Sequence, residues 1–182
     1  ERAPMCGVPF HSCEGYIARL VAKGYKVAIC EQTEDPATAK GLVKRDIIRV
    51  ITPGTVMESS MLDEGRNNYI CCMFSENKKI GLCFCDISTG ELCATEISGS
   101  DSVNSLTSQL ASYNPREILI GGDIVKIKSL PAFIKSKLSA GVEMLRDESF
   151  DNKLCTDTVN MQFGEEMQCI ADSQVLINAI GA

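Results

Sequence analysis

Three cations stand within six residues of one another in the stretch "VKRDIIRVITPGT". Lys44 and Arg45 precede a β-branched run, Arg49 lies inside the run, and a Pro-Gly pair ends it. If the run is a strand, alternation places Ile47, Arg49 and Ile51 on one face. The stem of Arg49 then covers apolar surface while its guanidinium reaches outward toward a negative group. Such cations either pair with carboxylates of their own chain or bind external anions such as phosphate.

The residues alone leave both interpretations open. Glu31 and Asp35 on the preceding segment are candidate acids for an ion pair with Arg49. Lys44 and Arg45 lie at a turn, where a solvated pair of charges is the ordinary arrangement.

The stretch "PMCGVPFHS" lies just ahead of a predicted helix. Gly7 permits another backbone to approach closely, and the two prolines fix the path of the chain. Taken alone, these residues are typical of a structural loop that caps the following helix.

The stretch "CDISTGEL" raises the question of a nuclease. Asp86 ends a predicted strand, where an enzyme with two metal ions would hold its first carboxylate. Such a site needs several converging acids, and Glu117 and Asp123 flank a later strand without a matching motif. The alternative is a hairpin in which Asp86, Ser88 and Thr89 bond their own backbone. An RNase H-like, metal-dependent nuclease is kept as the second hypothesis.

The ten cysteines raise the question of zinc or redox chemistry. No C-x-x-C spacing occurs and His11 is the only histidine, so a structural zinc site is hard to assemble. Cys71, Cys72, Cys83 and Cys85 fall inside apolar, strand-like runs, where a thiol behaves as a small hydrophobe. We therefore expect buried, reduced cysteines and no metal; a redox-responsive module is the third hypothesis.

The composition is typical of an ordinary globular protein, with 45% hydrophobic residues. No apolar run approaches the length of a membrane span, and we expect no secretion signal. The net charge of −6 divides into +2 over residues 1–56 and −8 over residues 57–182. The acidic part is a poor nucleic-acid surface, whereas the front part permits one. Because the sequence starts at Glu1 and ends within an apolar helical pattern, we expect a piece of a longer chain.

Periodicity and turn residues predict a mixed α/β chain in two parts. The front part has a helix, with Ser12 as its N-cap and Gly24 as its stop, and two strands. The back part follows a polar linker and begins with a three-stranded antiparallel meander, in the element order of an RNase H-like domain. We expect helices at 11–24, 34–41, 102–114, 125–138 with a break at Pro131, and from 175 onward; strands at 25–32, 46–54, three between 69 and 97, 116–122 and 141–150; and a loop-rich or helical connection at 153–174.

Several stretches occur together in the order and rough spacing of bacterial MutS, a family of DNA mismatch recognition proteins. They are "PMCGVPFHS", "GYKVAICEQTEDPATAKGLVKR", "RVITPGT", "DISTGEL", "NPREILI" and "QFG". The combination of VAICEQ, DPATAKG and RVITPGT is specific, whereas DISTGEL and QFG are weak alone. The resemblance covers nearly the whole chain.

The resemblance implies a domain organisation. Residues 1–56 would be the later part of the mismatch-binding domain, residues 57–174 an RNase H-like connector domain, and residues 175–182 the start of a lever-domain helix. The connector would link DNA reading to the ATPase and clamp parts and offer a docking surface to MutL.

The resemblance also implies contacts with DNA. Arg49 would bind a backbone phosphate, which positions the duplex without reading its sequence. Lys44 and Arg45 would lie near the same DNA. The loop ahead of the first helix would lie near the minor groove beside the mismatch, with Met5, Pro9 and His11 as candidate contacts.

Two family features are not found here. The mismatch reader, a Phe-x-Glu motif upstream of "PMCGVPFHS", is not in residues 1–10, and no G-x-x-x-x-G-K-[ST] loop is present. We therefore expect no enzymatic activity, no catalytic residue and no cofactor for this chain. The resemblance implies that the longer protein is a cytoplasmic homodimer, not membrane-bound, that binds mismatched double-stranded DNA and uses ATP and Mg²⁺.

Overall fold

The structure is a computed structural model that describes residues 7–35, 37 and 41–182. The chain divides into two compact units, residues 1–53 and residues 54–182, and each is described by itself. Among the described residues, no helix has the length and apolar character needed to cross a membrane.

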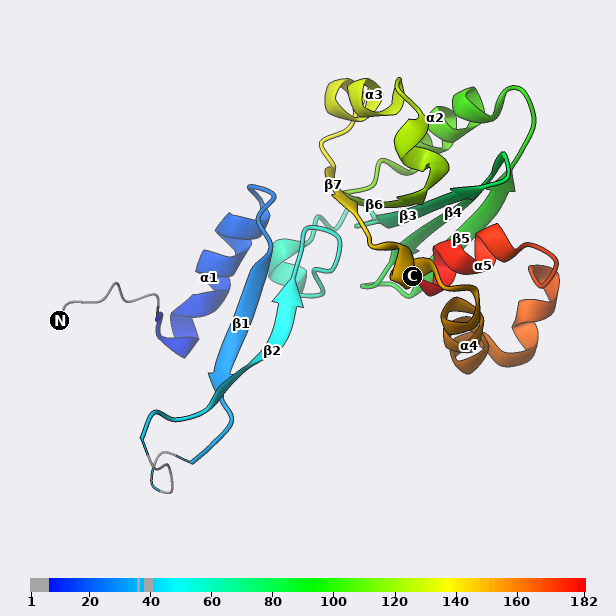
Figure 1. The fold of residues 1–182 in the computed structure, drawn as a ribbon. Helices are drawn as coiled ribbons and strands as arrows, with labels where there is room; N and C mark the ends of the chain where they lie inside the picture. The colour runs from blue at the N-terminus through cyan, green and yellow to red at the C-terminus, as the bar shows by residue number, and fades with distance from the viewer. Residues whose placement is uncertain (1–6, 36, 38–40) are drawn as a thin grey trace. The chain divides into compact units, whose positions relative to one another are not determined.

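The first unit combines one helix with a two-stranded antiparallel sheet (Figure 1). Its elements are α1 (Phe10–Val21), β1 (Val27–Gln32) and β2 (Arg45–Ile51). The N-cap of α1 is Pro9 and not the predicted Ser12, because the extended backbone of Pro9 already directs the chain into the helix and its carbonyl accepts from Ser12 N at 2.9 Å. Gly24 follows the helix with a φ of +84°, as its predicted role as a stop requires.

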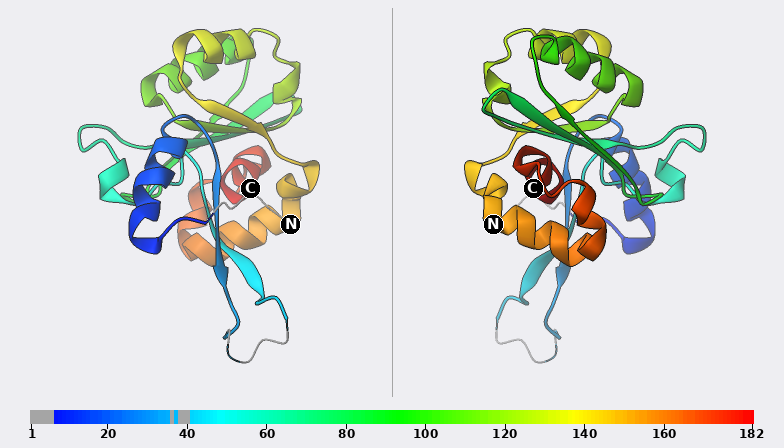
Figure 2. Two further views of the ribbon diagram at one scale, coloured as in Figure 1. Left: turned by 90° about the vertical axis from the view of Figure 1, so that its left-hand side faces the viewer. Right: turned by 90° about the vertical axis from the view of Figure 1, so that its right-hand side faces the viewer.

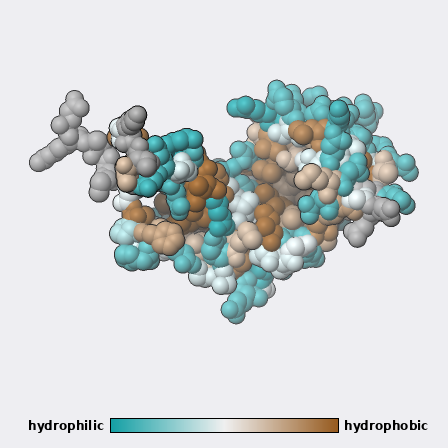
Figure 3. All heavy atoms as spheres, turned by 90° about the horizontal axis from the view of Figure 1, so that it is seen from below, coloured by the Kyte–Doolittle hydropathy of each residue, from teal (hydrophilic) through white to brown (hydrophobic). Residues whose placement is uncertain are grey.

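The first unit buries few of its apolar side chains. Phe10 is 84% exposed, and Ile47, Ile48 and Val50 of β2 are also exposed. Apolar surface is visible on this unit among hydrophilic side chains when the molecule is seen from below (Figure 3). A unit of this size cannot build a large core, so these side chains are left for contact with other surfaces.

The second unit is a five-stranded mixed sheet with helices on both faces (Figures 1 and 2). In the strand order β5-β4-β3-β6-β7, the first three form the predicted antiparallel meander, and β6 and β7 run parallel to β3. The mixed sheet and its helices confirm the predicted α/β, RNase H-like fold class. The strands are β3 (Ile70–Glu76), β4 (Lys79–Asp86), β5 (Glu91–Ile97), β6 (Glu117–Gly122) and β7 (Gly141–Met144).

Helices α2 and α3 cover one face of this sheet and α5 covers the other, with α4 packed on α5 (Figure 2). Alternation along β3 supplies both faces: Met73 packs with Leu106 of α2 and Ile134 of α3, while Phe74 packs with Val175 of α5. The helices are α2 (Ser102–Tyr113), α3 (Leu130–Lys137), α4 (Asn152–Phe163) and α5 (Gln174–Gly181), and the 3₁₀ turns are η1 (Ser59–Met61), η2 (Asp123–Lys126), η3 (Asp147–Phe150) and η4 (Gly164–Cys169).

Two expected elements differ in detail from those observed, and a third, for which two alternatives were left open, is now assigned. The helical region expected at 125–138 is interrupted before Pro131 and not at it, because η2 ends at Lys126 and α3 begins at Leu130. Pro131 lies in the first turn of α3, where a missing N–H removes no hydrogen bond within the helix. The strand expected at 141–150 ends at Met144 and turns into η3. The connection at 153–174 is helical, because Asp151 caps α4 by accepting from Leu154 N at 2.9 Å.

The β4–β5 hairpin is fixed by the side chain of Asp86, which is 1% exposed. Its carboxylate accepts from Asn68 N and Ser88 N, both at 2.9 Å, and from Ser88 Oγ at 2.6 Å. Gly90 completes the turn with a φ of +75°. Burial alone would raise the pKa of Asp86, but the hydrogen bonds from Ser88, Asn68 and Thr89 outweigh it and hold the pKa below its usual value. The predicted hairpin role of Asp86 is confirmed.

The cysteines of the central strands lie in the core. Cys71, Cys83 and Cys155 are buried, and Cys30 and Cys169 are exposed, all as free thiols. Burial raises the pKa of the thiols of Cys71, Cys83 and Cys155 above its ordinary value. These three side chains are therefore protonated apolar groups at neutral pH. The strand pattern predicted this for Cys71 and Cys83, whereas Cys72 and Cys85, predicted with them, are half-buried.

We expect Asp86→Asn to lower the free energy of unfolding by about 1–3 kcal/mol at neutral pH, because an amide NH₂ would face the donors that now bind a carboxylate oxygen. The pKa of Asp86 is lower in the folded protein, so its stabilisation is complete above the unfolded pKa of about 3.9 and is lost as the pH falls through the folded value. Urea unfolding at several pH values should show the two proteins converging in acid. A constant difference down to the most acidic pH would contradict this account.

We expect brief alkylation of the native chain to modify Cys30 and Cys169 and to spare Cys71, Cys83 and Cys155, which are buried and protonated. Peptide mass spectrometry before and after unfolding in guanidinium checks this. Rapid modification of the three buried thiols in the native chain would contradict the core described above and would favour the redox-responsive module.

Candidate nucleic-acid interface

Lys44 and Arg45 lie where β2 begins, beside the end of β1. Arg45 stands opposite Gln32 in the last pair of the ladder. The Lys44 side chain is 70% exposed and pairs with Asp46, at 3.1 Å between Nζ and Oδ2; Asp46 also accepts from Thr33 Oγ1 at 3.3 Å. An ion pair this exposed contributes little to stability, so the ammonium can exchange a carboxylate for a phosphate at small cost.

Arg49 lies in the middle of β2, opposite Ile29 of β1. The next pair of the ladder joins Cys30 of β1 with Ile47, so Ile48 has no partner in β1 and forms a bulge. Arg49 is half-buried and Ile51 is buried, which agrees with the predicted common face. Ile47 departs from that prediction and is 63% exposed, because the bulge interrupts the alternation.

The structure therefore places Arg45 and Arg49 on one strand and Lys44 directly before it. Arg45 and Arg49 are four residues apart, which corresponds to roughly 13 Å along an extended strand. Lys44 and Arg45 are exposed, whereas Arg49 is half-buried. The three cations therefore form a row of positive charge, which is most exposed where β2 begins and less exposed at Arg49.

The other candidates lie on or before α1. Pro9 forms the N-cap and His11 lies in the first turn, and both are exposed. The unsatisfied N–H groups of a helix N-terminus favour negative groups, so the position of these two residues is compatible with contact to a sugar-phosphate backbone. Met5 lies outside the described residues. The roles of all six candidates remain predictions.

The acids considered for a nuclease have other partners. The carboxylate of Asp86 accepts from its own hairpin and from Asn68. Glu117 is 3% exposed and accepts from Gly54 N at 3.2 Å, while Asp123 pairs with Lys126. Among the described residues, no group of three or more His, Cys, Asp or Glu side chains is arranged to hold a metal ion.

Glu117 has a positioning role that the sequence did not reveal. It opens β6 and binds the backbone of Gly54, the residue that follows the "RVITP" end of the first unit. The fit is close, because a Cβ at Gly54 would lie 2.9 Å from Cβ of Glu117. This bond attaches the start of the second unit to its central sheet. No local signal could have predicted it, since the two residues are 63 positions apart in the sequence.

Comparison with known families and proteins assigns both units. The sequence model described as MutS domain I matches residues 1–60, and the one described as MutS domain II matches residues 68–182. Proteins named "DNA mismatch repair protein MutS" from Acetivibrio thermocellus and Ruminiclostridium cellulolyticum are each 43% identical over 182 residues, which is 100% of this chain and 21% of theirs. The protein of that name from Clostridium tetani is 46% identical over 150 residues, 82% of this chain and 17% of its own.

The chain thus spans about a fifth of the length of these relatives. It carries sequence matching domains I and II, and its fold in the second unit is the mixed α/β domain that the motifs predicted. This chain belongs to the MutS family of DNA mismatch repair proteins.

Proposed function

We propose that this chain is the DNA-contacting and connecting part of a DNA mismatch recognition protein. The observation that carries the proposal is that the matches to MutS domains I and II follow one another along the chain, over residues 1–60 and 68–182. The uneven charge supports it, since the net charge is +2 over residues 1–56 and −8 over residues 57–182. Phosphate binding needs clustered cations, which the first part has.

In this proposal the row of cations on β2 contacts the DNA backbone. Arg49 binds a phosphate, Lys44 and Arg45 extend the contact, and the residues around the start of α1 lie near the minor groove, with Met5, Pro9 and His11 as candidates. The partial burial of Arg49 supports this role. A side chain that packing already restricts has fewer rotamers to lose, so binding a phosphate costs it less conformational entropy. These contacts position the duplex and do not identify the mismatched base.

The second unit acts as a connector in this proposal. Both faces of its sheet are covered by helices, and the bond between Glu117 and Gly54 fixes the segment that enters it. A packed α/β block of this kind transmits displacement with little internal deformation. Its acidic surface suits docking to a protein, for which we propose MutL, better than contact with DNA.

The remaining activities are assigned to the longer protein. We place ATP and Mg²⁺ outside these residues, because the sequence has no phosphate-binding G-x-x-x-x-G-K-[ST] loop and the matches are to domains I and II. Homodimer formation and a cytoplasmic location belong to the same proposal. The metal-dependent nuclease is the weaker alternative, since the carboxylate of Asp86 already accepts three hydrogen bonds.

The proposal is tested by comparing this chain with a longer MutS chain that carries the upstream Phe-x-Glu segment. We expect the longer chain to prefer a mismatched duplex and this chain to bind matched and mismatched duplexes about equally. Fluorescence anisotropy at one fixed salt concentration measures both. Equal mismatch preference in the two chains would mean that the reading element lies within these residues, and the proposal would be wrong.

Arg49→Ala in the longer chain tests the phosphate contact separately. We expect weaker binding to matched and mismatched duplexes alike, and a plot of log K against log salt concentration that is flatter by about 0.9, the slope of one phosphate contact. Lys23→Ala is the matched control, because Lys23 is an exposed cation of the same unit that we do not place at the DNA. An unchanged salt slope for Arg49→Ala would favour the ion-pair interpretation.

A further inference from the structure

The strand β7 is the last strand of its sheet and presents an open edge. Gly141 N donates to Arg116 O, and Leu145 N donates to Ile120 O, both at 3.0 Å, so odd-numbered positions of β7 face β6. In a parallel ladder the positions between them point their N–H and C=O groups the other way. The backbones of Val142 and Met144 therefore face outward, and their side chains are 50% and 69% exposed.

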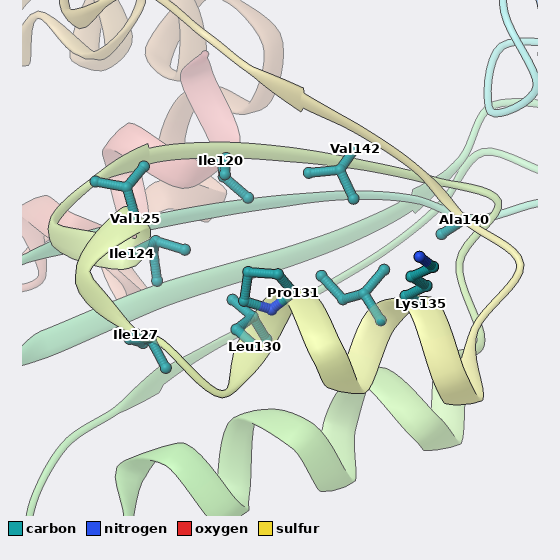
Figure 4. A pocket seen from close by; sticks show the side chains of 10 residues that line it. Ile120, Ile124, Val125, Ile127, Leu130, Pro131, Lys135, Ala140 and Val142 are labelled. Carbon is teal, nitrogen blue, oxygen red and sulfur yellow. The ribbon is translucent and has the colours of Figure 1, made fainter.

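An apolar pocket of about 290 Å³ lies beside this edge, between β6–β7 and α3 (Figure 4). Val142 and Ala140 line it on the strand side, and Leu130, Pro131 and Ile134 line it on the helix side. The pocket is small for a whole ligand but suits an apolar side chain from a segment lying along β7. An exposed edge next to an apolar pocket is the arrangement by which extended peptides add to a sheet.

One lysine, Lys135, lines this pocket, and the segment that forms its helix side carries three more. Residues 123–140 carry four lysines and one aspartate, a net charge of +3 within a part of the chain whose net charge is −8. Asp123 neutralises Lys126, while Lys128, Lys135 and Lys137 form no ion pair in the part of the chain that the structure describes. Figure 4 shows Lys135 next to Ala140 at one end of the pocket. The local charge therefore favours an acidic occupant.

We propose that the edge of β7 and this pocket bind an extended acidic segment of a partner protein, in which acidic and apolar residues alternate. The segment adds to the sheet by bonding the outward N–H and C=O groups of Val142 and Met144. Its apolar side chains enter the pocket, and its carboxylates meet Lys128, Lys135 and Lys137. This site is separate from the DNA contact proposed for the first unit and does not depend on it.

The test uses the whole 182-residue chain and a short fluorescent peptide in which Glu alternates with Ile and Val. We expect it to bind at least about tenfold more tightly than a peptide with Lys in place of Glu, with an affinity that falls as salt rises. Replacing a central apolar residue of the peptide by proline should abolish binding, because proline cannot donate to a ladder.

Two variants of the chain localise the binding. Val142→Pro removes the outward N–H without touching the bonds to β6 and should weaken binding about fivefold. Lys135→Glu together with Lys137→Glu should weaken it about tenfold. Lys153→Glu, the same charge change on α4, should leave binding unchanged. Circular dichroism of each variant checks that it is folded.

Three results would overturn the proposal. The first is equal binding of the acidic and basic peptides. The second is unchanged binding by folded Val142→Pro, which would remove the strand-addition geometry. The third is a dimer of this chain that Val142→Pro dissociates, measured by sedimentation, because the occupant of the edge would then be a second copy. None of these results bears on the mismatch preference of the longer chain.

Discussion

The second unit depends on the position of β3 between an antiparallel and a parallel neighbour. β3 pairs with β4 through a tight hairpin, but its pairing with β6 joins segments that are separated by β4, β5 and α2. That parallel pairing forces a crossover, and α2 must then lie on a face of the sheet. Because β3 alternates between two sets of apolar side chains, the other face also needs a helix, which is α5, and α4 packs on α5 in turn. The edges of the sheet and the outer surfaces of the helices are then the parts of the second unit that another molecule can reach.

The two units differ in charge and in how much apolar surface they bury. The first unit is small, carries a positive row on β2 and buries little apolar surface, which suits a part that functions in contact with something else. The second unit is acidic overall, with one basic region around α3. Under the proposed function, this difference in charge would favour phosphate contact at the first unit and disfavour it at the second. The bond from Glu117 to Gly54 lies within the second unit and fixes its first residue to its own sheet.

The sequence predicted what local rules control. Leu106 and Leu110 fall on the buried face of α2, and the turn between β3 and β4 uses Asn77 and Lys78 with positive φ, as a two-residue hairpin demands. The bulge at Ile48 was not predictable, because it arises from the pairing of β1 and β2 and not from either strand alone.

Contacts between residues that are far apart in the sequence could also not be predicted from the sequence pattern. Asn178 of α5 is 1% exposed, and its amide is satisfied on both sides. Its Nδ2 donates to Asn152 Oδ1 at 2.8 Å, 26 positions away in the sequence, and its Oδ1 accepts from Gln174 Nε2 at 2.8 Å. The sequence pattern also gave no indication that Lys135 lies at a pocket beside the open edge of β7. Of the candidate DNA contacts, the sequence predicted residue types and strand, but burial and exposure came from the structure.

The central claim is that the first unit touches DNA and the second does not. It is tested most directly by photo-crosslinking a longer MutS chain to a mismatched duplex with reactive groups on its phosphates, followed by peptide mapping. The account predicts adducts at residues 41–51 and around the start of α1, and none on the sheet of residues 70–144. Adducts concentrated on that sheet, with the β2 segment unlabelled, would contradict it.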